Sequence, residues 1–235
     1  HLNKREFWDA VHLRYTWPIS RLPSRCACGE PFNIGHALSC KKGGFVHRRH
    51  DAIRDMTGDL LNEVCHDVCI EPPLLELTGE TLSLRTANAA RDARLDISAR
   101  GVWSREQRAF FDVRVFDPNA RSYQNQFLSQ AYRKNELEKK CHYNERVREI
   151  EYGTFTPLVF SVYGGMGQEC KVFYKRLCSL LSEKRGENYS IVFSWVRTRT
   201  SLSLLRSASI CFRSASIVGE NVGAGRLLGG LGGPP

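Results

Sequence analysis

The chain has 235 residues, of which 42% are hydrophobic and 25% charged, as is usual for a soluble globular domain. No run approaches the roughly 18 apolar residues that a membrane-spanning helix needs, which excludes an integral membrane protein of that kind. The formal net charge of +9 favours a polyanionic partner such as nucleic acid. The length suits one main core with a small additional module. No signal peptide is visible. Because the chain begins at His1 rather than Met, we expect a piece of a longer product.

The cysteines indicate a reducing, intracellular compartment. There are nine of them, an odd number, and a chain of this size does not need disulfide bonds to fold. Three cluster near the N-terminus beside a histidine. We expect the other six to pack as small apolar residues.

Hydrophobic periodicity and turn residues predict an ordered series of elements. In chain order these are a helix at 5–16, a Cys/Gly-rich knot at 24–46, a helix at 48–65, an extended segment at 67–75, strands at 93–99 and 108–116, a helix at 124–151, a strand at 156–162, and helices at 167–184 and 189–213. The Pro72-Pro73 pair limits the segment at 67–75 to an edge or an end of the sheet. This order predicts an α/β fold with a mixed central β-sheet flanked by helices. We divide the chain into an N-terminal module at 1–46, a main domain at 47–213 and a disordered Gly/Ser-rich tail at 214–235.

The Cys/Gly-rich knot carries a candidate zinc site. Cys26, Cys28, His36 and Cys40 supply three thiolates and one imidazole, which is a complete tetrahedral set. The alternative is three buried free cysteines and an unrelated histidine. Because four ligand-type residues lie within a short segment between turn residues, we favour structural zinc.

A second constellation points to phosphodiester chemistry. Asp96 and Asp112 come at the ends of two strand-like runs, and two carboxylates on adjacent strands can hold Mg²⁺ or Mn²⁺. In the following helix, Lys139 and Lys140 can each reach toward the strand ends, with Tyr143 on the same face. Each residue alone has a plainer interpretation, such as a surface ion pair. Together they predict a metal-dependent nuclease, because a carboxylate beside a buried strand needs a partner.

Further residues are weaker candidates. Glu63, late on the helix at 48–65, is a tentative third magnesium ligand. Asp51 is a candidate N-cap of the same helix. The residues expected to contact nucleic acid are Lys41, Lys42, Arg49, His50 and Arg114.

These motifs resemble the C-terminal region of non-LTR retrotransposon polyproteins that carry a restriction-like endonuclease. The Cys-Cys-His-Cys knuckle is followed by Arg49-His50-Asp51, where the family has Arg-His-Asn. The family's Pro-Asp motif matches Leu95-Asp96, and its second acidic motif matches Asp112-Val113-Arg114. Its lysine and tyrosine match Lys139 or Lys140 with Tyr143. The resemblance covers about residues 5–213, and Arg114 stands where many PD-(D/E)XK nucleases have the catalytic lysine.

The resemblance implies a restriction-endonuclease-like fold and a nuclear DNA endonuclease. It implies a nick with a 3′-hydroxyl that primes reverse transcription of the element's RNA by the polymerase domain of the same polyprotein. Asp96 and Asp112 would bind the catalytic metal, and Lys139 or Lys140 would orient the attacking water. Two alternatives stay open: an inactive nucleic-acid-binding domain of a decayed element, and a zinc-stapled interaction domain.

Overall fold

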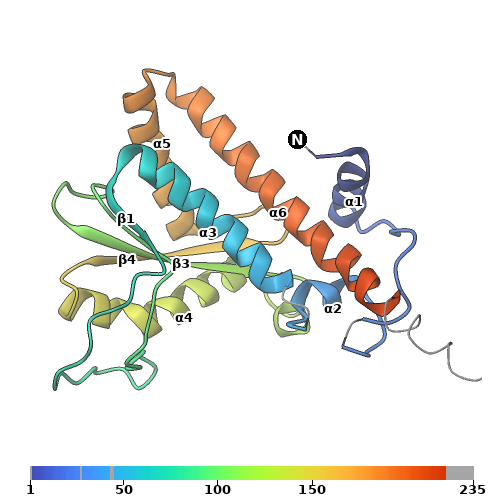
Figure 1. The fold of residues 1–235 in the computed structure, drawn as a ribbon, viewed down its shortest axis with the longest axis horizontal. Coiled ribbons are helices and arrows are strands. Elements are labelled where there is room, and N and C mark those ends of the chain that lie inside the picture. The colour runs from blue at the N-terminus through green and yellow to red at the C-terminus, as the bar shows by residue number, and fades with distance from the viewer. Residues whose placement is uncertain (1, 27, 43–44, 221–235) are drawn as a thin grey trace, which may run out of the picture.

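The computed structural model describes residues 2–26, 28–42 and 45–220. Its elements are α1 (Lys4–Arg14), α2 (Ile34–Ser39), α3 (Phe45–Val64), β1 (His66–Ile70), β2 (Ile97–Arg100), β3 (Arg108–Phe116), a 3₁₀ turn (Arg121–Tyr123), α4 (Leu128–Glu149), β4 (Thr154–Ser161), α5 (Gln168–Arg185) and α6 (Tyr189–Glu220). The predicted α/β class is confirmed: a four-stranded mixed sheet is flanked by helices (Figure 1). None of the helices among the described residues is long and apolar enough to cross a membrane.

The sheet has the strand order β1-β2-β3-β4. The first two pairings are antiparallel, and β3 pairs with β4 in parallel. β1 is an edge strand, as the Pro72-Pro73 pair predicted, because proline cannot donate to a strand ladder. β2 begins at Ile97 while β3 runs on to Phe116, so β3 extends past the start of β2.

The side chains of β3 alternate between two helical layers. Phe111 and Val113 belong to the main core with α3 and α5, and Phe111 packs against Phe173 with ring centroids 4.6 Å apart. Phe110 packs in a separate cluster with Val147 of α4. Figure 1 shows α4 on one side of the sheet and α3, α5 and α6 on the other. Asp112 lies between Phe111 and Val113 along β3, so it shares the side of Phe110 and points toward α4.

Three sequence expectations need correction or extension. The knot at 24–46 contains the short helix α2, and α1 and α2 pack on α6 through the cluster Leu13, Ala37, Leu38, Val162, Ala208, Cys211 and Phe212. α3 begins at Phe45, so Asp51 lies inside the helix and is not its N-cap. α6 continues to Glu220, so residues 214–220, which were predicted to belong to the tail, are helical, because no Gly or Pro interrupts that helix before Gly219. The remainder of the predicted tail, 221–235, lies outside the described residues.

Candidate functional site

Asp112 and Lys139 form a buried ion pair between the sheet and α4. Lys139 Nζ lies 2.7 Å from Asp112 Oδ2, and the two side chains are only 18% and 8% exposed. Asp112 Oδ2 has no hydrogen-bond partner besides Lys139 Nζ within the part of the chain that the structure describes. Burial raises the pKa of Asp112, while the charge of Lys139 opposes this shift and that of Asp96 adds to it. The ammonium group of Lys139 is therefore what compensates the burial of this oxygen.

Asp96 lies beside Asp112, immediately before β2. Its Oδ2 accepts a 2.5 Å hydrogen bond from the Val113 backbone N–H, which β2 no longer covers at that point. The Asp96 backbone N–H donates to Phe111 O at 3.1 Å. The two carboxylates therefore meet where β3 extends past β2. This junction explains why residues 16 positions apart lie together.

His50, on α3, is the third residue at this junction. Its Nε2 lies 3.0 Å from Asp96 Oδ2, and its Nδ1 lies 3.3 Å from Asp51 Oδ1. Burial alone would lower the pKa of His50, but the hydrogen bond and charge of Asp96, with help from Asp51 and Asp112, raise it overall. The sequence suggested a phosphate contact, or a capping or packing role, for His50, and in the structure the ring pairs with the Asp96 carboxylate.

The two candidate lysines have different partners. Lys140 Nζ pairs with Glu169 Oε1 of α5 at 2.7 Å and so points away from Asp112. Tyr143 is half-buried against Phe155, and Lys139 Nζ lies 5.8 Å from the centre of the Tyr143 ring. Lys139 is therefore the lysine that the fold brings to the carboxylates, with Tyr143 beneath it.

Two other candidates, Glu63 and Arg114, form ion pairs with residues outside the junction of Asp96 and Asp112. Glu63 forms a bidentate ion pair with Arg185, with a shortest distance of 2.7 Å. It is 13 residues from His50 on the same helix, which separates them by about 20 Å at 1.5 Å per residue. Arg114 shares the α4-facing side of β3 with Asp112, and its Nη1 lies 3.8 Å from Glu138 Oε1. Glu63 is thus not a ligand of the same ion as Asp96.

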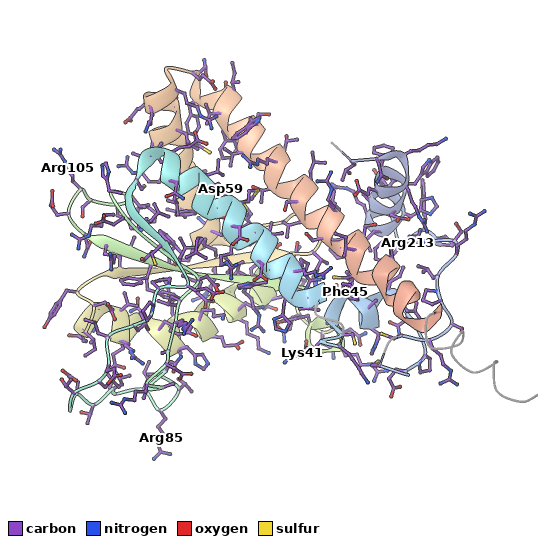
Figure 2. All side chains as sticks on the ribbon, in the orientation of Figure 1. Lys41, Phe45, Asp59, Arg85, Arg105 and Arg213 are labelled. Atoms are coloured by element: carbon purple, nitrogen blue, oxygen red, sulfur yellow. The ribbon has the colours of Figure 1, made fainter. Side chains whose placement is uncertain are left out.

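Arg49 was expected to contact phosphate, and that prediction is wrong because the structure buries its side chain. The residue is 2% exposed, and its Nη1 donates to Leu38 O at 3.0 Å. The guanidinium ties the end of α2 to the region of β3 near Val115, where its Nη2 lies 3.5 Å from the carbonyl oxygen. Lys41 and Lys42 are exposed on the segment between α2 and α3, where Figure 2 labels Lys41.

Arg146 is a positioning residue that the sequence did not reveal. It is fully buried on α4, and its guanidinium donates to the carbonyls of Leu75, Asn88 and Ala90 at 2.7 to 2.9 Å. These carbonyls belong to the long loop between β1 and β2 that leads to Asp96. Arg146 therefore fixes the path of that loop. A lone arginine on a helix gives no local sign of partners so distant in the chain.

The Cys/His cluster is assembled as the sequence predicted. The ligand atoms of Cys26, Cys28, His36 and Cys40 all lie within 4.8 Å of one another. Cys26 Sγ is 3.8 Å from Cys40 Sγ, and Cys28 Sγ is 3.1 Å from His36 Nε2. A tetrahedron with Zn–S bonds of about 2.3 Å has S–S edges of about 3.8 Å. The donor set and its spacing therefore fit a zinc ion.

Local structure holds these four ligands in place. Cys26 and Cys28 lie in a tight turn, in which Gly29 has a φ of +95° and its N–H donates to Cys26 O at 2.8 Å. His36 lies in the first turn of α2, capped by Asn33, and Cys40 follows the last turn. A hydrogen bond from the Glu30 backbone lowers the pKa of Cys28 to about 7, whereas burial raises the pKa of Cys40 to about 11. Metal binding requires both thiols to be deprotonated.

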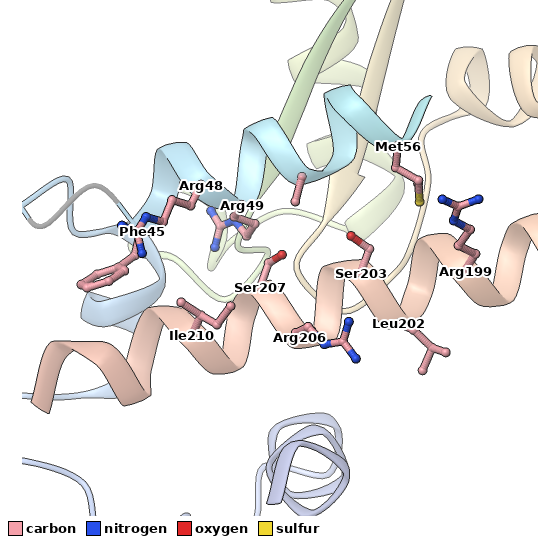
Figure 3. A pocket seen from close by; sticks show the side chains of 11 residues that line it. Phe45, Arg48, Arg49, Met56, Arg199, Leu202, Ser203, Arg206, Ser207 and Ile210 are labelled. Atoms are coloured by element: carbon pink, nitrogen blue, oxygen red, sulfur yellow. The ribbon is translucent and has the colours of Figure 1, made fainter. Parts of the chain in front are cut away.

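A groove between α3 and α6 is separate from both centres. It encloses about 460 Å³ and includes Arg48, Arg199 and Arg206 (Figure 3). Arg206 Nε lies 3.3 Å from Glu6 Oε1. The α3 residues that line it include Ala52, which is about 200° around the helix from His50. The groove therefore opens on the other side of α3 from the two aspartates.

No family model matches this chain, and no curated protein matches it significantly in sequence.

Proposed function

We propose that this chain is a metal-dependent DNA endonuclease domain with a restriction-like fold, stapled by an N-terminal zinc ion. One observation carries the proposal: Asp96, Asp112 and Lys139 come from three separate segments and converge at the junction of β2 and β3. A purely structural role for all three is less economical, because burying two neighbouring carboxylates is costly, and Lys139 pairs with Asp112 alone while His50 offsets the charge of Asp96 only when protonated.

The residues present fit a magnesium or manganese ion. Asp96 and Asp112 offer hard oxygen ligands, and Mg²⁺ commonly binds through one or two carboxylates while keeping several waters. Within the described ranges Asp112 Oδ2 has no hydrogen-bond partner besides Lys139 Nζ, so an ion bound at that oxygen would compete with the lysine alone. When bound, such an ion supplies a Lewis acid for the phosphodiester and lowers the pKa of a bound water.

The protein's own groups have distinct roles in this proposal. Asp96 and Asp112 hold the ion, and the Val113 N–H and His50 keep Asp96 in place. Lys139 Nζ places a positive charge beside Asp112, where it stabilises negative charge that develops on the scissile phosphate. Arg114 and the exposed Lys41 and Lys42 are candidates for phosphate contacts that position the DNA.

The proposed reaction is hydrolysis of one DNA strand. Water attacks the phosphorus, the bond from phosphorus to the 3′ oxygen breaks, and the products are a 3′-hydroxyl and a 5′-phosphate. In the retrotransposon family that the motifs resemble, this hydroxyl primes reverse transcription. We accordingly propose the polymerase domain of the same polyprotein and the element RNA as partners.

Arg114 favours one alternative function. It stands two residues after Asp112, at the position where related nucleases often have the catalytic lysine, and it faces Glu138. If Lys139 does not replace that lysine, the domain binds nucleic acid without cutting it. That alternative predicts DNA binding that survives removal of Asp112 and no cleavage with any divalent metal.

The test is nicking of supercoiled plasmid by the zinc-loaded chain with Mg²⁺ or Mn²⁺. We expect relaxation by the parent chain and a loss of at least about a hundredfold in Asp112→Asn and in Asp96→Asn, since both variants remove a metal ligand. Glu63→Gln is the matched control, because it removes a carboxylate from the same domain outside the junction. Failure of the parent to nick, with DNA binding intact in all variants, would support the inactive alternative.

A further inference from the structure

α1 and the loop after it carry a continuous row of exposed aromatic rings. Trp8, Tyr15 and Trp17 are 52%, 59% and 50% exposed. Trp8 contacts His12 edge to face at 5.6 Å, His12 contacts Trp17 at 5.6 Å, and Tyr15 stacks on Trp17 at 5.3 Å. We name these four residues the aromatic surface. An apolar patch left open to solvent in this way marks an interaction site.

The aromatic surface is held in a fixed geometry. His12 Nδ1 lies 2.7 Å from Pro18 O, and the Trp17 N–H donates to His12 O at 2.8 Å. Beneath it, Asp9 forms a buried ion pair with Arg213 of α6 and accepts a 3.1 Å hydrogen bond from Ser209. α1 therefore lies beside α6, on the side of that helix away from the sheet (Figures 1 and 2, where Arg213 is labelled). Rings ordered before binding lose little entropy when a ligand stacks on them.

The charges around this surface are positive. Both acidic residues of α1 are neutralised, Asp9 by Arg213 and Glu6 by Arg206. Lys4, Arg5 and Arg14 are exposed, and none of these three has an ion-pair partner among the described residues. Arg5 lies one helical turn before Trp8, and thus on the same face of α1. Exposed rings edged by unpaired cations are typical of surfaces that bind single-stranded nucleic acid.

We propose that the aromatic surface binds a single strand of nucleic acid, with bases stacked on Trp8, Tyr15 and Trp17 and with phosphates near Arg5 and Arg14. A duplex fits less well, because its bases already stack on one another and offer no free faces. A protein partner fits less well, because the surface combines its apolar rings with uncompensated positive charge. The proposal does not depend on nuclease activity, since α1 contributes no residue to the junction of Asp96 and Asp112.

The test is a binding titration of the full zinc-loaded chain carrying Asp112→Asn, so that no cleavage intervenes. The probes are a fluorescent oligothymidine strand and an abasic strand of equal length, which keeps the phosphates and lacks the bases. Trp8→Leu with Trp17→Leu should weaken oligothymidine binding by about tenfold or more, from the usual energy of base stacking on aromatic side chains. Binding of the abasic strand should be weak and unchanged.

Matched controls come from exposed rings elsewhere. Phe127 and Tyr152, which flank α4, are 78% and 82% exposed, so Phe127→Leu and Tyr152→Leu should leave affinity unchanged. Arg5→Ala should lower the magnitude of the salt slope by about 0.7, the value for one lost phosphate contact on a single strand. Circular dichroism verifies that each variant folds.

Three results would overturn the proposal. The first is equal affinity for the oligothymidine and abasic strands. The second is unchanged oligothymidine binding in the double tryptophan variant. The third is a shift in oligomeric state of the double variant without a change in affinity, which would make the aromatic surface a protein contact. None of these results bears on plasmid nicking, so single-strand binding by the aromatic surface can be refuted while the proposed endonuclease function stands, and the reverse.

Discussion

Lys139 Nζ lies 2.7 Å from Asp112 Oδ2, whereas the adjacent Lys140 points to Glu169 at the start of α5. Lys139→Met should therefore reduce plasmid nicking by at least about a hundredfold, as expected when a charge that stabilises the transition state is removed. It should also lower the free energy of unfolding by about 3 kcal/mol, because Asp112 is left buried without a cation.

Lys140→Met is the matched control for that variant. Its ion pair with Glu169 is about one-third exposed, and such pairs contribute at most about 1 kcal/mol. We expect nicking within about twofold of the parent chain and a similar melting temperature. Equal losses of nicking in the two variants would contradict the assignment of Lys139.

The zinc prediction concerns both metal content and stability. The double substitution Cys28→Ser and Cys40→Ser removes two of the four ligands and should abolish stoichiometric zinc, measured by mass spectrometry of the purified protein. Since α1 and α2 share an apolar cluster with α6, loss of the ion should also lower the melting temperature. Cys69→Ser, at an exposed cysteine in β1, is the control and should leave both quantities unchanged. Unchanged zinc in the double variant would refute the site.

Arg146 supports the loop that leads to Asp96, so its removal should lower both the stability of the chain and its nicking activity. Arg146→Met leaves three backbone carbonyls without their donor, which we expect to cost about 3 kcal/mol of stability, read from urea unfolding. Nicking should also fall at temperatures where the variant is still folded, because Asp96 is held less firmly. Arg148→Met, at an exposed arginine two residues further along α4, should change neither. A variant as stable as the parent would exclude the proposed support.

Local sequence patterns determine where helices and strands form, but they do not determine which side chains meet in the folded chain. The elements that carry Asp112 and Lys139 were predictable because apolar periodicity and turn residues place strands and helices directly. The strand predicted at 93–99 begins only at Ile97, so Asp96 lies just before it. The choice between Lys139 and Lys140 was not, since neighbouring helical residues point about 100° apart and only the rotation of α4 about its axis selects one. Arg49 and His50 differ for the same reason: one enters the interior and the other meets Asp96. The partners of Arg146 lie 56 to 71 residues away along the chain and have no local signature.

His50 gives a prediction that depends on pH. Its pKa is raised in the folded chain, because its contacts with Asp96 and Asp51 and the charge of Asp112 outweigh the effect of burial. A histidine whose folded pKa is raised contributes stability that is complete below its unfolded pKa of about 6.5 and is lost as the pH rises through the folded pKa.

The extra stability of the parent over His50→Gln, about 1 kcal/mol for a partly buried pair, should be present near pH 6 and shrink in alkaline buffer. Urea unfolding of the zinc-loaded chain without added Mg²⁺ measures it. His66→Gln, at an exposed histidine in β1, should show no such trend. A stability difference that grows with pH would contradict this prediction, because it would mean that the surroundings hold His50 in the neutral form. The contact with Asp96 would then be a hydrogen bond between a neutral ring and a carboxylate instead of an ion pair.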